Sequence, residues 1–195
     1  MSSLRLTADA RRSQILDVAI DVFGRAGYYG ASMNDIADAA GVTKPVLYQH
    51  FDSKSDLYSA LLDEVGNRML ALIVDATSGA ENGRQQTEFG FQAYFRWVAN
   101  RHDEFMLLFG GAARHDTEFN TTIKRITAAA AAAIDPLIAV DLDPDVRRTL
   151  AHGLVGLAEG ASRLLVDRGE DFDPDAIARS VSSLAWAGLR AVDRS

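Results

Sequence analysis

Cysteine is absent from the 195-residue sequence, and only four prolines occur in it. The lack of cysteine excludes disulfide bonds, thiolate zinc sites and thiol nucleophiles. The longest apolar run, residues 128–134, is too short to cross a bilayer and is followed by Asp135 and Pro136. The N-terminal residues also lack the apolar segment and cleavage site of a secretion signal. We therefore expect a soluble, cytoplasmic protein with no membrane partner.

An excess of positive charge is missing too. The formal net charge is −7, and 24% of the residues are charged. Such a chain does not bind nucleic acid or anionic membranes through bulk electrostatics. The hydrophobic content of 48% is sufficient for a buried core, so disorder is not expected.

Alternating polar and apolar residues, the pattern typical of strands, are almost absent as well. Apolar residues recur with a period near 3.6, which predicts an all-α protein. The clearest break is the segment 78–83, which contains two glycines. The sequence predicts nine helices: 8–26, ended by Gly27; 33–40; a short one that Thr43 can cap; one that Ser53 caps and that reaches about residue 77; an aromatic-rich one after the break; and 103–109, 117–139, 145–168 and 175–192.

The segment 32–51 has the pattern of a helix-turn-helix. Ser32 can cap one short helix with Asp35 three residues on, and Gly41 supplies a tight turn. Six apolar residues can form a small shared core: Ile36, Ala37, Ala40, Val42, Leu47 and Phe51. The face left outward on the second short helix suits a DNA groove and carries Thr43, Lys44, Val46, Tyr48, Gln49 and His50.

These side chains divide into base readers and phosphate contacts. Lys44 can donate to guanine, Gln49 can pair with adenine, and Val46 can lie against a thymine methyl group. Donors suited to phosphate groups are Ser32, Thr43, Tyr48, His50 and Lys54. Asn34 is a further candidate for base contact. The alternatives are that Tyr48 and His50 are polar tips of a half-buried helix, that Val46 packs inward, and that Asn34 is only solvated.

The same segment resembles the N-terminal signature of the TetR family of bacterial transcriptional regulators. The matching residues are Ser32, Ile36, Ala37, Ala40, Gly41, Val42, Thr43, Leu47, Tyr48, His50, Phe51, Ser53 and Lys54. The resemblance implies a TetR-like nine-helix fold, with a DNA-binding domain over residues 1–58 and an effector-binding and dimerisation domain over 59–195. It further implies a homodimeric regulator of operator DNA, most simply a repressor released by a hydrophobic small-molecule effector, without a cofactor or enzymatic activity.

One feature departs from a strongly basic DNA-binding domain. Residues 1–60 contain six basic side chains and seven aspartates, a net charge of −1. Affinity for DNA should therefore depend on locally placed cations, including an arm formed by Arg5, Arg11 and Arg12, and should vary only modestly with salt.

The rest of the chain predicts an effector pocket and a dimer interface. The candidate pocket residues are Phe91, Tyr94, Phe95, Val98, Phe105, Met106, Phe109, His152 and Trp186, with plain core packing as the alternative. Apolar faces wider than a monomer core requires run along the last two helices. The candidate interface residues there are Leu150, Leu154, Leu157, Ala161, Val181, Leu184 and Gly188, with internal packing as the alternative.

Two other classes of protein fit the sequence less well. A metal enzyme is disfavoured because the loop with Asp141, Asp143 and Asp145 has Val146 where a calcium loop needs glycine, and because the His102 and His115 clusters lack di-iron spacing. We therefore expect no metal site and no catalysis. A helical dimer that binds a small molecule but no DNA would leave the polar outward face from Thr43 to His50 unexplained.

Overall fold

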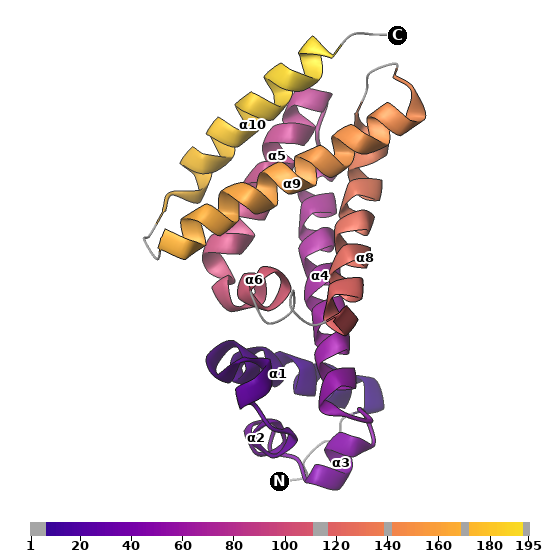
Figure 1. Cartoon of the computed structure of the whole chain (residues 1–195), viewed down its shortest axis with the longest axis vertical. Coiled ribbons are helices and arrows are strands. Elements are labelled where there is room, and N and C mark those ends of the chain that lie inside the picture. Colours follow the sequence, from indigo (N-terminus) through magenta and orange to yellow (C-terminus); the bar gives the residue numbers. More distant parts are fainter. Residues whose placement is uncertain (1–6, 111–116, 139–141, 169–171, 193–195) are drawn as a thin grey trace. The chain divides into compact units, whose positions relative to one another are not determined.

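The computed structural model describes residues 7–110, 117–138, 142–168 and 172–192. Within these ranges the chain is helical and contains no strand (Figure 1), which confirms the predicted all-α class. The elements are α1 (Ala8–Gly30), α2 (Met33–Ala39), α3 (Lys44–Tyr48), α4 (Lys54–Ser78), α5 (Gly83–Asn100), α6 (His102–Phe109), α8 (Thr117–Ile134), a 3-10 helix (Asp135–Leu137), α9 (Pro144–Arg168) and α10 (Pro174–Ala191).

Helix α1 is interrupted where the sequence predicts its end. The Thr7 side chain accepts a hydrogen bond from the Ala10 amide at 3.2 Å and caps the first turn. Gly27 has a φ of 68°, a left-handed conformation that breaks the helical path before residues 28–30. The periodic helix therefore ends at residue 26, and the following residues form a separate turn.

The helix-turn-helix core is buried as predicted. Exposure is 5% or less for Ile36, Ala37, Ala40, Leu47 and Phe51, whereas Val42 is half-buried. Gly41 turns the chain with a φ of 64°, and the Val42 amide then donates to the carbonyl of Ala37 at 3.0 Å. Residue spacing alone therefore predicted both the short helices and the turn between them.

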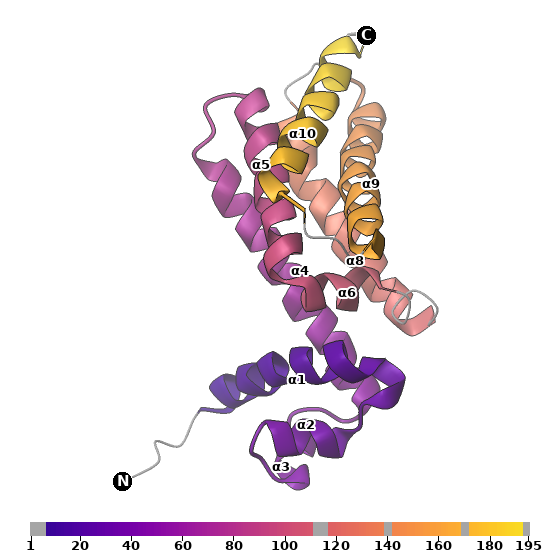
Figure 2. The same cartoon turned by 90° about the vertical axis from the view of Figure 1, so that its left-hand side faces the viewer.

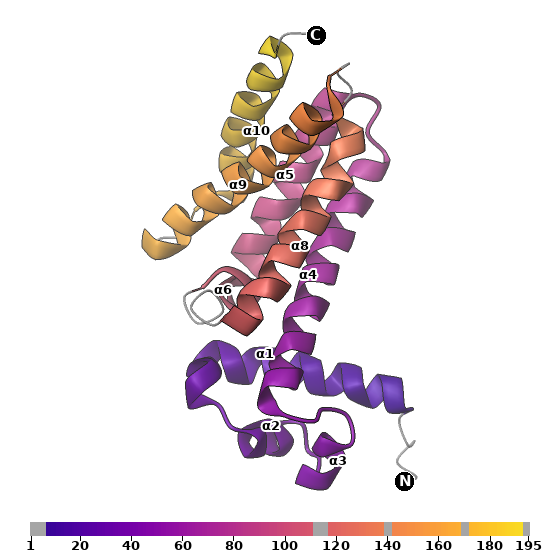
Figure 3. The same ribbon diagram turned by 45° about the vertical axis from the view of Figure 1, so that its right-hand side comes forward.

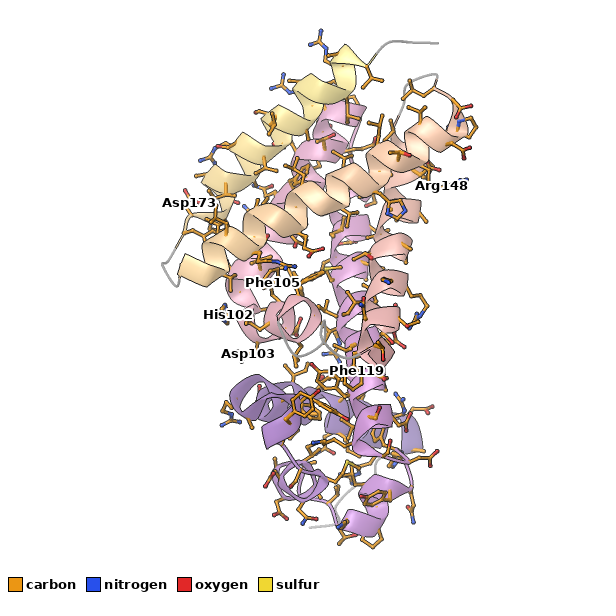
Figure 4. The ribbon with its side chains drawn as sticks, in the orientation of Figure 1. His102, Asp103, Phe105, Phe119, Arg148 and Asp173 are labelled. Carbon is orange, nitrogen blue, oxygen red and sulfur yellow. The ribbon has the colours of Figure 1, made fainter. Side chains whose placement is uncertain are left out.

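The described residues form two compact units that do not follow a single cut after residue 58. Unit 1 comprises the described residues up to Val65 together with those of 103–122, and unit 2 comprises 66–102 and 123–192. Phe119 on α8, labelled in Figure 4, explains why distant residues join unit 1. The centre of its ring lies 4.7 Å from the ring centres of both Tyr28 and Tyr58. Asp103 on α6 lies close to Gly24 on α1. A Cβ added to Gly24 would lie 3.1 Å from the carboxyl carbon of Asp103.

In unit 2, α10 lies along α5 (Figure 3). Arg96 on α5 donates two hydrogen bonds to the Asp175 carboxylate on α10, at 2.8 and 3.0 Å. Gly66 on α4 allows α8 to approach, because a Cβ there would lie 2.8 Å from Ile126. The sequence predicted a helix to residue 139, but α8 ends at Ile134 and a 3-10 turn follows. The reason is Pro136, which has no amide hydrogen to continue the helix.

No helix among the described residues is both long and apolar enough to traverse a lipid bilayer.

Candidate nucleic-acid interface

Helix α3 presents most of its predicted face to solvent. Thr43, Lys44, Tyr48 and Gln49 are exposed, whereas Val46 and His50 are half-buried. Thr43 stands at the N-cap without a side-chain hydrogen bond to the helix, and the Lys44 ammonium lies 5.9 Å from the centre of the Tyr48 ring. Figure 2 shows α2 and α3 side by side, joined by their short turn. The face that sequence spacing predicted for a DNA groove is thus accessible on a surface helix.

The start of α2 is held by a capping box. The Ser32 hydroxyl donates to the Asp35 carboxylate at 2.7 Å and accepts from the Asp35 amide at 3.2 Å, while the Ser32 amide donates to the same carboxylate at 2.9 Å. The hydrogen bonds from Ser32 lower the pKa of the Asp35 carboxyl below its ordinary value. Ser32 is exposed, but its hydroxyl hydrogen is committed to the cap; Asn34, two residues on, is exposed as well.

Lys54 has a role that its position in the sequence did not indicate. Its ammonium donates to the backbone carbonyls of Tyr28 at 2.8 Å and Ala31 at 3.0 Å, and lies 4.5 Å from the centre of the Tyr28 ring. Two of its three N–H groups therefore hold the last turn of α1 and the residue that follows it. Sequence reasoning missed these contacts because Tyr28 and Ala31 are 26 and 23 residues away.

An open depression, here called the α2–α3 depression, brings five of the nine predicted DNA contacts together. Its volume is about 460 Å³, and its lining residues are Tyr29, Gly30, Ala31, Ser32, Met33, Asn34, Lys44, Tyr48 and Lys54. This lining contains two lysines, a serine hydroxyl, an asparagine and two phenols, but no carboxylate. An anion is therefore the charge-complementary occupant. Tyr29 is the member of this set that sequence reasoning did not single out.

The predicted basic arm is partly engaged within the protein. The Arg12 guanidinium lies 4.7 Å above the Phe51 ring, and Arg11 donates to the Gln14 side chain at 2.7 Å. Arg5 lies outside the described residues.

The candidate pocket residues fall in both units, and most are buried. In unit 2, exposure is 7% or less for Phe91, Tyr94, Phe95 and Val98, whereas Trp186 is half-buried and His152 is exposed. In unit 1, Phe105 and Phe109 are buried and Met106 is 41% exposed. Met106 and His152 therefore differ from the other candidates, because each lies on the surface of the single chain.

The candidate interface residues divide into two groups. Leu150 and Leu154 are partly buried against an internal cluster that includes Ile138 and Ala151, so internal packing accounts for them in part. Leu184 and Gly188 are exposed on α10, and the remaining residues, Leu157, Ala161 and Val181, are half-buried. A Cβ built on Gly153, Gly156, Gly160 or Gly188 would meet no atom within 4 Å. An open, nearly flat track therefore runs along α9.

Where the chain is described, no three histidine or carboxylate side chains lie close enough together to hold a metal ion. His115, Asp116 and Asp141 fall in parts that the structure does not describe.

This helix-turn-helix geometry, with a polar helix exposed beside a cationic depression, defines a class of DNA-binding regulators, and the comparisons with known proteins agree. Residues 15–61 match the family described as bacterial regulatory proteins, tetR family. The chain is 33% identical over 187 residues to the HTH-type transcriptional activator FasR of Mycolicibacterium smegmatis. The matched region covers 95% of this chain and 85% of FasR. The protein belongs to the TetR family, as the segment 32–54 predicted.

Solved structures agree with this assignment. A TetR-like transcriptional regulator from Rhodococcus sp. RHA1 superposes with a TM-score of 0.76 at 26% identity, covering 96% of this chain and 100% of the other. The regulator FadR from Bacillus subtilis, solved in complex with stearoyl-CoA, superposes with a TM-score of 0.77 at 20% identity, covering 90% and 98%. At this low identity, the likeness to FadR shows only that the two proteins share a fold. Together with the family match, the fold makes this chain a DNA-binding transcriptional regulator.

Proposed function

We propose that the protein binds a pseudo-palindromic operator as a homodimer, with α3 of each protomer in the major groove. The observation that carries this proposal is the accessible face of α3 beside the carboxylate-free α2–α3 depression. Lys44, Gln49, Val46 and Asn34 read bases, and Thr43, Tyr48, His50 and Lys54 contact phosphates. Ser32, also predicted as a phosphate contact, gives both of its donors to Asp35 and instead fixes the start of α2. In a dimer of this kind, the two recognition helices lie about 34–36 Å apart or slightly more, one helical turn of DNA. A regulator that acts on the genome of a bacterium works in the cytoplasm.

The second protomer is expected on α9 and α10. Leu164 on α9 and Leu184 on α10 are 54% and 64% exposed, and the glycine track of α9 is open. Large apolar side chains next to a flat helical surface favour close helix packing with an identical partner. This supports a dimer interface formed by the exposed parts of the two helices.

A hydrophobic effector is the proposed signal. In support, buried aromatic rings line α5, and the Tyr94 hydroxyl is buried without a hydrogen-bond partner among the described residues. Burial raises the pKa of Tyr94 to about 12, so the phenol stays protonated at neutral pH and can donate to a ligand. The Ser162 hydroxyl lies beside this phenol, and its own hydrogen is donated to the Ala158 carbonyl. We therefore propose an effector with an apolar portion that packs against these rings and a hydrogen-bond acceptor that meets the phenol, and we propose no catalytic role.

Selection of bound fragments from a random DNA pool by the full chain tests this function. The expected result is a pseudo-palindrome, bound by two protomers and released when a hydrophobic ligand such as stearoyl-CoA is added. A reporter gene behind the recovered operator then shows whether the protein represses or activates transcription. We propose repression. Activation, the activity in the name of the FasR relative, would overturn the proposed repression but not operator binding. If the ligand-free protein enriches no sequence, the operator proposal is wrong.

A further inference from the structure

Tyr29 has the largest exposed fraction of the large hydrophobic side chains that the structure describes, at 73%. It lies before the helix-turn-helix motif, in the last turn of α1 after the break at Gly27. Its ring packs edge-on against Tyr28, with centres 5.2 Å apart and planes at 75°. A singly exposed aromatic side chain is ordinary on a protein surface. The surroundings of Tyr29 are what set it apart.

The turn that carries Tyr29 is fixed on both sides. The Lys54 ammonium binds the carbonyl of Tyr28, directly before it, and the carbonyl of Ala31, two residues after it. The Tyr28 ring is itself held, because it packs against Tyr58 at 4.9 Å and Phe119 at 4.7 Å. A side chain presented by a fixed backbone loses less entropy when it binds than one on a loose loop.

Charge complementarity identifies the occupant of the depression that Tyr29 lines. Lys44 and Lys54 line it with Ser32 and Tyr48, and no carboxylate does, although the first 60 residues hold seven aspartates. Lys44 and Tyr48 also belong to α3. A duplex whose bases α3 reads therefore passes its sugar–phosphate backbone over this depression.

We propose that Tyr29 is an additional, sequence-independent DNA contact: its phenol donates a hydrogen bond to a backbone phosphate beside the groove that α3 occupies. The inference rests on the proposed placement of α3 in the major groove. Lys54 is then a positioning residue for this contact, since it holds the carbonyl groups on both sides of Tyr29. Phosphate contact by a phenol orients the protein without selecting bases.

The test compares Tyr29→Phe and Tyr29→Ala with wild type on two duplexes, the selected operator and poly(dI-dC). Loss of a hydrogen bond to phosphate should weaken binding by about three- to tenfold per protomer. Both variants should lose affinity for both duplexes by the same factor, so the ratio of specific to non-specific affinity stays unchanged. The salt dependence of binding should also stay unchanged, because the phenol carries no charge.

Val74→Ala is the matched control, because Val74 is 54% exposed and lies on α4 in unit 2. It should bind both duplexes like wild type. The melting temperatures of the Tyr29 variants should equal that of wild type, as expected for an exposed side chain, which shows that the variants are folded.

Three results overturn the inference: unchanged binding by Tyr29→Ala, wild-type binding by Tyr29→Phe, or a loss confined to the operator, which would indicate a base contact. Failure of wild type itself to bind the operator overturns the proposed function instead, so the two failures are distinguishable.

Discussion

Lys44 and Lys54 line the same depression, but their surroundings differ. Lys44 is exposed on α3, and its ammonium lies 5.9 Å from the centre of the Tyr48 ring. Lys54 is half-buried and donates to two backbone carbonyls. An exposed flexible cation can reach a base edge, whereas a cation held by the backbone acts at a fixed place. We therefore expect Lys44 to read bases and Lys54 to orient the protein on the duplex.

Replacing each lysine tests this division. Lys44→Ala should relax sequence preference at one operator position by about 1–3 kcal/mol, because a donor to guanine is lost. Lys54→Met should weaken binding to all sequences similarly and should also lower the melting temperature, because two carbonyls lose their donor. Binding to operator variants with single base changes, together with thermal unfolding, measures both effects.

Lys44→Met serves as the control for stability and should melt like wild type. If both lysine variants lose affinity uniformly across sequences, the division into reader and positioning residue is wrong.

At the scale of elements, α10 is joined to α5 by a pair of charged side chains. The Arg96 guanidinium holds the Asp175 carboxylate with two hydrogen bonds, and Gln92 adds a third at 3.3 Å. The hydrogen bonds from Arg96 lower the pKa of Asp175 below its ordinary value of 3.8, and they raise the pKa of Arg96. The ion pair therefore contributes to stability only while Asp175 is ionised.

The sign of this pH dependence follows from the lowered pKa. A carboxyl group whose pKa is lower in the folded state stabilises the fold above its unfolded pKa, and this contribution is lost as the pH falls through the folded value. Asp175→Asn should therefore be less stable than wild type by a constant amount near pH 7. Below about pH 4, near the reference pKa of aspartate, the difference should shrink.

Urea unfolding of both proteins at a series of pH values measures this difference. Asp145→Asn is the control, because Asp145 pairs with Arg148 within α9 and joins no second helix. If the difference in unfolding free energy between wild type and Asp175→Asn widens toward low pH, the stabilising role of ionised Asp175 is wrong.

At the scale of the whole molecule, the proposed function makes operator binding depend on a second protomer. Leu184 is 64% exposed on α10, and the single chain leaves the glycines of α9 open. Two recognition helices on one rigid dimer bind their half-sites as a linked pair, which raises affinity far above that of one helix. The interface is therefore a condition for function as well as for assembly.

Leu184→Glu should give a monomer, because a carboxylate would lie unpaired in the apolar interface. Affinity for the full operator should fall by on the order of 100-fold or more when the linkage is lost. Sedimentation measures the oligomeric state, and a binding titration measures the affinity.

Leu72→Glu is the matched control, since Leu72 is 52% exposed on α4, away from α9 and α10 in the sequence. A Leu184→Glu variant that remains dimeric would show that the protomers meet through another face.

Much of this protein was predictable from the sequence, because local features depend on residues a few positions apart. The Ser32–Asp35 capping box, the Gly41 turn and the buried positions of α2 and α3 follow from helical geometry at spacings of three and four residues. Most helix limits follow from the same periodicity, whereas α8 ends at Ile134, short of the predicted residue 139. The family was predictable for the same reason, since its signature lies within residues 32–54.

Tertiary structure decided which distant residues meet. The chain had to fold before Lys54 could reach Tyr28, Phe119 could pack on the rings of unit 1, or Arg96 could pair with Asp175, 79 residues away. The tertiary structure also showed that Leu150 and Leu154 pack against an internal cluster and that Tyr29 lines the α2–α3 depression. Periodicity indicates which face of a helix is buried, but it does not indicate what that face packs against, because the partner depends on how the chain returns.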